Sequence, residues 1–141
     1  MIEKSKQVRK TFAPDQDFFR EQDDQCMCLS MHQPWASLLV HGFKRFEGRM
    51  WSTKYRGPLW IHATSQKPAP EEIARLEEAY KEHYRQIGED MPPFPERYLT
   101  SSVIGRVDLV DVLSLEEYLE TVPKVLRETT ESAYQFVVRN P

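Results

Sequence analysis

One long amphipathic helix set among short strand-like segments restricts the fold of this chain more than any other feature of its sequence. Pro70 stands where a helix opens, Gly88 where one closes, and two glutamates fill the first turn. The apolar stripe between them repeats at helical spacing through Ile73, Leu76, Tyr80, Tyr84 and Ile87. This pattern predicts a helix over residues 70–87 that packs one face on the rest of the domain.

The segments around this helix are typical of strands. Residues 45–51, 58–64, 103–113 and 133–139 are rich in alternating apolar, aromatic and β-branched side chains. Gly105 favours a bulge in the third of them. Two shorter helices are expected, one from Pro34 to His41 and one that starts at the capping box formed by Ser114 and Glu117. Strands with helices inserted between them predict an α+β fold around a small sheet or barrel.

The chain length of 141 residues fits one domain. Residues 1–24 mix both charges without periodicity, so we expect a flexible N-terminal tail there and the folded domain over residues 25–141. No run approaches the ~20 apolar residues that cross a bilayer, and none near the N-terminus is typical of a signal peptide. We expect no membrane partner, and a monomer for the isolated domain.

The two cysteines, Cys26 and Cys28, are too few for a disulfide scaffold and indicate a reducing, intracellular setting. Together with His32 and His41 they form a candidate metal set, but the chain has no second cysteine pair. Residues 26–31 alternate like a buried strand, and we expect that strand to place both thiols in the core. The sequence therefore predicts no metal site and no cofactor.

Charge is unevenly distributed along the chain. The net charge is −3, yet residues 41–67 hold six cations against the single acid Glu47. Residues 71–97 hold eight acids and four bases. Local charge steers an anionic ligand more than total charge does, so the basic segment is the candidate contact for nucleic acid.

Side chains suited to nucleic acid share faces of the two strands in this segment. Glu47, Arg49 and Trp51 lie on one face of the first strand, because side chains alternate along a strand. Trp60 and His62 share a face of the next. Cations attract phosphates and aromatic rings stack on bases, a combination typical of proteins that bind single strands or loops. Glu47 would orient a neighbouring cation or accept from a base amino group.

A simpler interpretation stays open for each part of this set. Glu47 would then only pair with a cation, and Trp51 and Trp60 would belong to the core. For the two tryptophans alone we favour the core; for the basic cluster as a whole we favour function.

A family resemblance rests on the G-x-K-x-x-E-x-R motif at residues 42–49. The flanking matches are Gln33-Pro34-Trp35-Ala36, Tyr55-Arg56-Gly57, Ile61-His62-Ala63 and Ile104-Gly105-Arg106-Val107. Together they resemble the ASCH domain family from about Cys28 to Val138. The family generally continues past the strand that contains Phe136, so we expect a closing segment that this sequence lacks.

The resemblance implies a PUA-like β-barrel with helices that flank a basic cleft lined by the motif. It also implies binding of DNA or RNA, with little sequence specificity, by a module of a transcription coactivator complex. The implied partners are other subunits of that complex and transcription factors such as nuclear receptors, in the nucleus and the cytoplasm. The nucleic-acid contacts that we predict are Lys44, Arg45, Glu47, Arg49, Trp51, Lys54, Arg56, His62 and Lys67.

Two other functions stay open. Some small bacterial members of the family resemble amidohydrolases that act on acylated cytidine through a Lys and a Thr three residues apart. Here Lys44 is followed at that spacing by Glu47, so we expect no enzyme, although the pair itself suits acid–base chemistry on RNA or a modified nucleoside. A pure protein-interaction domain would instead use the acidic face of helix 70–87.

Overall fold

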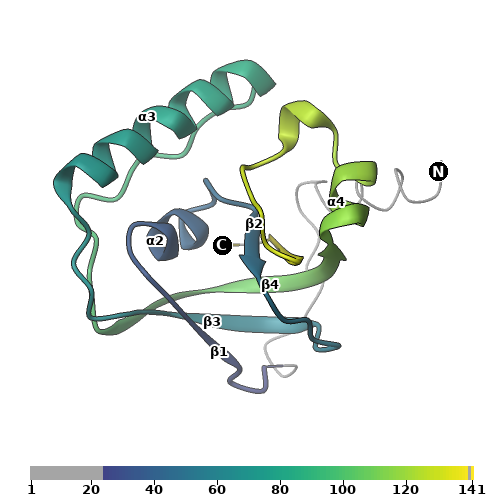
Figure 1. Cartoon of the computed structure of the whole chain (residues 1–141). Helices are drawn as coiled ribbons and strands as arrows, with labels where there is room; N and C mark the ends of the chain where they lie inside the picture. The colour runs from purple at the N-terminus through teal and green to yellow at the C-terminus, as the bar shows by residue number, and fades with distance from the viewer. Residues whose placement is uncertain (1–23, 140) are drawn as a thin grey trace.

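The computed structural model describes residues 24–139 and 141. In this part of the chain five strands form one mixed sheet in the order β1-β3-β4-β5-β2 (Figure 1). The strands are β1 (Cys28–Met31), β2 (Phe46–Arg49), β3 (Gly57–Ala63), β4 (Ser102–Ser114) and β5 (Tyr134–Arg139). The helices are α2 (Trp35–Val40), α3 (Pro70–Ile87), α4 (Leu115–Thr121) and the 3-10 turn η2 (Lys124–Leu126). The α+β prediction is confirmed.

The long strand β4 is the centre of the sheet. Its first half pairs with β3 and its second half with β5, both antiparallel. β5 then pairs antiparallel with β2, and β3 pairs parallel with β1, which leaves β1 and β2 at the two edges. The sheet curls into a half-barrel, and a side chain links its edges: the Arg49 guanidinium on β2 donates to the Ser30 carbonyl on β1 at 3.0 Å.

The main core fills the hollow of this half-barrel under α2. Its members are Leu29, Met31, Ala36, Leu39, Leu59, Ile61, Ala63, Val107, Leu109, Phe136 and Val138. Gly105 lets α2 approach β4, because a Cβ at that position would lie 2.3 Å from a methyl carbon of Val40. The register of β3 and β4 shifts beside Gly105, as expected for a bulge.

Two smaller clusters attach the other helices. α4 packs on β2, β4 and β5 through Phe46, Leu113, Tyr118, Val122 and Val137. α3 packs on Leu38 and Phe43 through Tyr80 and Tyr84. α2 therefore lies between α3 and the sheet (Figure 1).

Most predicted elements have their expected positions. α3 has the predicted bounds, and Gly88 ends it with a left-handed φ of 68°. The capping box of Ser114 and Glu117 is present at the start of α4. β2 is shorter than predicted, so Trp51 lies beyond its end, 50% exposed, with its ring edge on Phe136. Assigning Trp51 to the core was wrong.

The prediction of buried thiols is also wrong. Cys26 and Cys28 are both exposed. In β1 the alternation places Leu29 and Met31 in the core, and the intervening Cys28 and Ser30 face outward. The alternating pattern was correct, but its buried face was assigned to the wrong residues, because the leucine and methionine bury more apolar surface.

The flexible tail predicted for residues 1–24 lies outside the described residues except at its last position. There the Asp24 carboxylate accepts from Trp60 Nε1 at 2.8 Å and from Arg106 at 3.2 Å. The Cys26 amide, together with these side chains, holds the pKa of Asp24 below its usual value. Among the described helices, none combines the length and the apolar character that a membrane span requires.

Candidate functional site

Residues of the 42–49 motif line a cleft of about 560 Å³. One side of the cleft is the end of β1 with the start of α2, and the other is the segment 128–132 that leads into β5. Four consecutive residues of β2, Phe46–Arg49, line it between them. The cleft therefore follows the edge of the sheet at β2.

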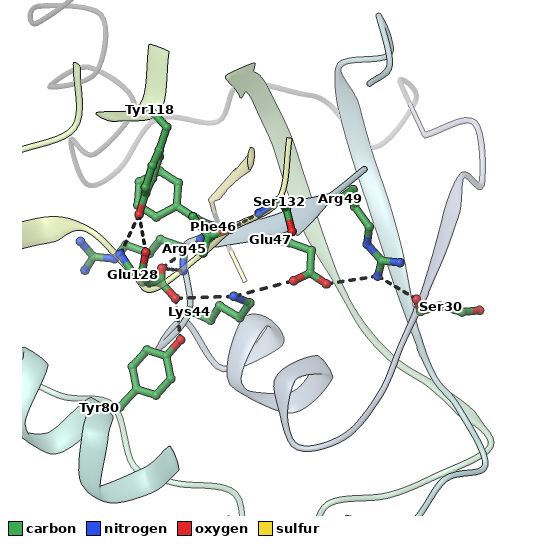
Figure 2. Close-up of polar contacts among 11 residues, drawn as sticks. Ser30, Lys44, Arg45, Phe46, Glu47, Arg49, Tyr80, Tyr118, Glu128 and Ser132 are labelled. Carbon is green, nitrogen blue, oxygen red and sulfur yellow. Dashed lines mark hydrogen bonds and ion pairs between the residues drawn. The ribbon is translucent and has the colours of Figure 1, made fainter. Parts of the chain in front are cut away.

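The ammonium group of Lys44 lies between two carboxylates in this cleft (Figure 2). Its Nζ is 3.7 Å from Glu47 Oε1 and 3.7 Å from Glu128 Oε1. All three side chains are largely buried: Lys44 is 11% exposed, Glu47 14% and Glu128 10%. Salt screens partly buried charges much less than surface charges, so these two ion pairs remain strong in solution. Glu47 and Glu128 together therefore hold the ammonium group of Lys44 in place.

Glu128 also holds the segment 128–132 in place. Its Oε2 accepts the backbone N–H groups of Arg45 at 2.8 Å and Phe46 at 3.1 Å, and its Oε1 accepts the Tyr80 hydroxyl at 2.5 Å. Its backbone is bound twice by the Tyr118 hydroxyl, which donates to the carbonyl and accepts from the N–H. Burial, and then the nearby Glu128 carboxylate, raise the pKa of Tyr80 well above its ordinary value. This one residue connects β2, α3 and α4.

Arg49 extends from β2 across the cleft to β1 (Figure 2). One terminal nitrogen of its guanidinium donates to Glu47 Oε2 at 3.1 Å and to the Ser30 carbonyl at 3.0 Å. The buried Nε of Arg49 has no hydrogen-bond partner among the described residues, and neither has Oε1 of the cleft residue Gln135, which is 1% exposed. Gln135 pairs directly with Gly48, so its side chain lies on the face of β2 opposite to Arg49, and both unpaired atoms are closed to solvent.

Gly48 is required by the close approach of the segment that follows Glu128. A Cβ at this position would lie 2.6 Å from Ser132 Oγ and 2.9 Å from Thr130 Oγ1. Both contacts are shorter than real Cβ atoms show. The glycine of the motif therefore allows the 128–132 segment to cross β2 and form its side of the cleft.

The cleft lining is rich in hydroxyl groups and balanced in charge. Its hydroxyl residues are Thr64, Thr129, Thr130 and Ser132, Ser30 contributes its carbonyl, and His32 Nδ1 bonds Thr64 Oγ1 at 2.7 Å. Among the described lining residues two cations, Lys44 and Arg49, meet three carboxylates, Glu47, Glu128 and Glu131. The lining therefore offers directional hydrogen bonds rather than an excess of positive charge.

The structure brings three of the predicted contacts together, Lys44, Glu47 and Arg49, and places the other predicted cations elsewhere. Arg45 leaves the cleft for Glu89, at 2.6 Å, and lies over the Tyr84 ring. Arg56 is 3.6 Å from Asp111 on β4. Lys54 and Lys67 are exposed and do not line the cleft.

The predicted aromatic contacts also lie outside the cleft. His62 accompanies Trp60 on the outer face of β3, where its Nδ1 is 3.1 Å from Ser30 Oγ. Glu47 pairs directly with Phe136, a member of the main core, and direct pairs share a face. Glu47 and His62 therefore point to opposite faces of the sheet. Trp51 stands at the end of β2, two positions beyond Arg49.

Sequence reasoning missed Glu128, Tyr80, Gln135 and the hydroxyls of residues 129–132. Glu128 lies in an irregular segment between η2 and β5, without periodicity that would indicate its direction. Tyr80 was assigned to the apolar stripe of α3. The bond from its hydroxyl to Glu128 can be recognised only when the position of α3 beside the 128–132 segment is known. The polar run Thr129, Thr130, Glu131 and Ser132 was the one available signal of a ligand-facing segment.

No group of three His, Cys, Asp or Glu side chains in residues 24–139 and 141 is arranged to hold a metal ion. The two cysteines considered as ligands stand at the outer face of β1 and just before it.

Comparison with known proteins matches the chain to one family. The family model of the ASCH domain matches residues 29–140, which include the motif and the whole cleft. Activating signal cointegrator 1 of Mus musculus and of Homo sapiens are each 45% identical to the chain over 127 residues, 90% of this chain and 21% of each relative. The chain thus spans about a fifth of the length of these relatives. The half-barrel is consistent with the PUA-like barrel that the motif implied, and the chain belongs to the ASCH domain family.

Proposed function

We propose that this domain binds DNA or RNA with little sequence specificity, and that it does so without catalysis. The observation that carries the proposal is the cleft at β2, where the family motif presents Lys44 and Arg49 beside the hydroxyl residues Thr129, Thr130 and Ser132. Its volume of about 560 Å³ suits a nucleotide, whereas a whole duplex would remain outside. The domain would take up an unpaired or terminal nucleotide.

Each part of the cleft has a role in this proposal. The terminal nitrogens of Arg49, whose side chain is 25% exposed, would donate to the phosphate of the bound nucleotide. Lys44 would supply positive charge, with Glu47 as its orienting partner. Trp51, half exposed near Arg49 in sequence, would stack on a neighbouring base. The cations outside the cleft, Arg45, Lys54, Arg56 and Lys67, together with His62, would attract the rest of the polymer over the outer surface.

The cellular role follows from the similarity to activating signal cointegrator 1. We infer a coactivator-related, RNA-binding role for the domain, within an assembly that contains other cointegrator subunits. Transcription factors such as nuclear receptors would be reached through that assembly, in the nucleus and the cytoplasm.

A titration of single- and double-stranded DNA and RNA at two salt concentrations tests the binding. Three to five engaged cations give a log–log salt slope of about −2 to −3.5 on single strands. Arg49→Gln should weaken binding to every sequence and flatten that slope by roughly 0.7.

Arg85→Gln is the matched control for this titration, because Arg85 lies on the exposed face of α3 and pairs with Glu82. Equal slopes for the two variants would show that the cleft is not the nucleic-acid site. The alternative function, in which the acidic face of α3 binds a protein partner, would then replace this proposal.

A second candidate function, hydrolysis of a modified nucleoside, is favoured by the placement of Lys44 between Glu47 and Glu128. A buried lysine between two carboxylates is suited to general acid–base catalysis. This alternative expects the wild type to hydrolyse N-acylated cytidine and Glu47→Gln to lose that activity. The binding proposal expects no turnover by the wild type.

A further inference from the structure

A second cavity, of about 310 Å³, lies next to the motif cleft on the side of α3. Four residues line both: Trp35, Lys44, Glu128 and Thr129. The remaining lining comes from α3 and from the residue that precedes Glu128: Arg75, Leu76, Ala79, Tyr80, His83 and Arg127. The two cavities are therefore neighbours that meet at Lys44 and Trp35.

The charge of this second cavity differs from that of the first. Among its described lining residues three cations, Lys44, Arg75 and Arg127, meet the single carboxylate Glu128. That carboxylate already accepts two backbone N–H groups and the Tyr80 hydroxyl, so its oxygens are occupied by donors of the protein. The positive charge that the motif cleft lacks is thus present on the α3 side.

The cations of the cavity differ in how firmly they are held. Arg127 donates to the carbonyls of Leu119 and Val122 at the end of α4, which fixes its guanidinium. Arg75 only approaches Glu72 at 3.9 Å, and its side chain is 66% exposed. Exposed ion pairs of this kind contribute little to stability, so a phosphate group would readily displace Glu72. Arg75 is therefore the cation available to a ligand.

We propose that this cavity binds a backbone phosphate of the nucleic-acid strand whose base occupies the motif cleft, with Arg75 as its principal contact. The inference rests on the proposed function and assigns a second subsite to it. Arginine presents planar paired donors that match phosphate oxygens, and Lys44 faces the same ligand from the shared wall. The strand crosses Trp35, which borders both cavities. Helix α3 is acidic as a whole, but its residue Arg75 thus contributes a positive charge to the binding surface.

A pair of arginines on α3 tests the proposal. Arg75 lines the cavity, whereas Arg85 lies on the same helix outside the lining and pairs with Glu82. Arg75→Gln and Arg85→Gln therefore make the same change of charge on one helix. A ten-nucleotide deoxythymidine strand is titrated into each variant at low and high salt. Arg75→Gln should flatten the log–log salt slope by about 0.7, and Arg85→Gln should leave it unchanged.

The outcomes separate this inference from the proposed function. If Arg49→Gln weakens binding while Arg75→Gln behaves like Arg85→Gln, the motif cleft binds nucleic acid and the α3 cavity takes no phosphate. If the wild type binds no oligonucleotide, both proposals are wrong. If the wild type binds a polyglutamate peptide more tightly than the oligonucleotide, and Arg75→Gln removes that binding, the cavity is a site for an acidic protein and the phosphate assignment is overturned.

Discussion

The hydroxyl of Tyr80 donates to Oε1 of Glu128 at 2.5 Å and thereby connects helix α3 to the segment that forms one side of the motif cleft. The other oxygen of the same carboxylate holds the first residues of β2. The motif strand, α3 and the 128–132 segment thus share one anchor. Changes at this anchor should affect the stability of the fold and the shape of the cleft together.

Removal of the carboxylate is the first test of this anchor. Glu128→Ala leaves the N–H groups of Arg45 and Phe46 without their acceptor and removes one of the two carboxylates beside Lys44. Breaking a largely buried charge cluster costs about 3–5 kcal/mol, and urea unfolding measures the loss. Glu131→Ala is the control, since Glu131 is an exposed carboxylate of the same segment. A loss at Glu128 no larger than at Glu131 would show that the anchor contributes little.

The anchor also predicts that the free energy of unfolding depends on pH in the alkaline range. Because burial and the adjacent Glu128 carboxylate raise the pKa of Tyr80 in the folded protein, only the unfolded chain ionises this tyrosine above pH ~10. The unfolded state then binds fewer protons, and the free energy of unfolding falls as pH rises.

Tyr80→Phe isolates this contribution. It should be less stable than the wild type by about 1–3 kcal/mol at pH 8, through the lost hydrogen bond to a charged group. Above pH 10 the difference between wild type and variant should shrink by about 1.4 kcal/mol per pH unit. Chemical denaturation at pH 8, 10 and 11 measures it. A difference that stays constant over this range would contradict the raised pKa.

The sequence predicted the elements of this fold better than the contents of its cleft. The stripe of α3 and its capping glycine, and the capping box of α4, are local patterns whose physical causes lie within a few residues. The alternation in β1 was also visible, but it did not say which face is buried, and the cysteines were placed wrongly. Which face is buried depends on the sheet and helix that cover the strand.

The motif likewise predicted part of the site. Lys44, Glu47 and Arg49 are brought together because they share one short stretch of chain. Glu128 joins them only through tertiary packing, from an irregular segment. Counting charges along residues 41–67 joined cations that the fold separates, such as Arg56, which pairs with Asp111. Local charge in sequence is therefore a poor measure of charge in a cleft formed by distant segments.

The docking of α2 should be a main source of stability. Leu38 is fully buried between α2 and α3, where it contacts the cluster of Phe43, Tyr80 and Tyr84. Leu38→Ala should cost about 2–5 kcal/mol, as other large-to-small changes in cores do. Leu119→Ala removes the same atoms at a position 49% exposed and serves as the control in thermal unfolding. Equal shifts in Tm would show that α2 and α3 are not packed together as described.

Gly48 gives a test that links stability to binding. Gly48→Ala brings a methyl carbon to within 2.6 Å of Ser132 Oγ and 2.8 Å of Ser132 Cβ. Rotation about χ1 can move Oγ away but leaves Cβ in place, so the 130–132 segment must move off β2. Overpacking of this kind typically costs 1–3 kcal/mol. We expect a lower Tm and, in the titration of single-stranded DNA, weaker binding.

Ser132→Gly removes two of the three atoms that lie within 3.0 Å of the added methyl, leaves Thr130 Oγ1 at 2.9 Å, and should partly rescue the alanine variant. In a double-mutant cycle Gly48→Ala combined with Ser132→Gly should recover at least half of the lost stability and binding, since coupling energies between contacting residues reach about 0.5–3 kcal/mol. Ser132→Gly alone measures the separate cost of a more flexible backbone. Additive effects of the two changes would show that the 128–132 segment does not cross β2 at Gly48, and that the cleft has a different shape.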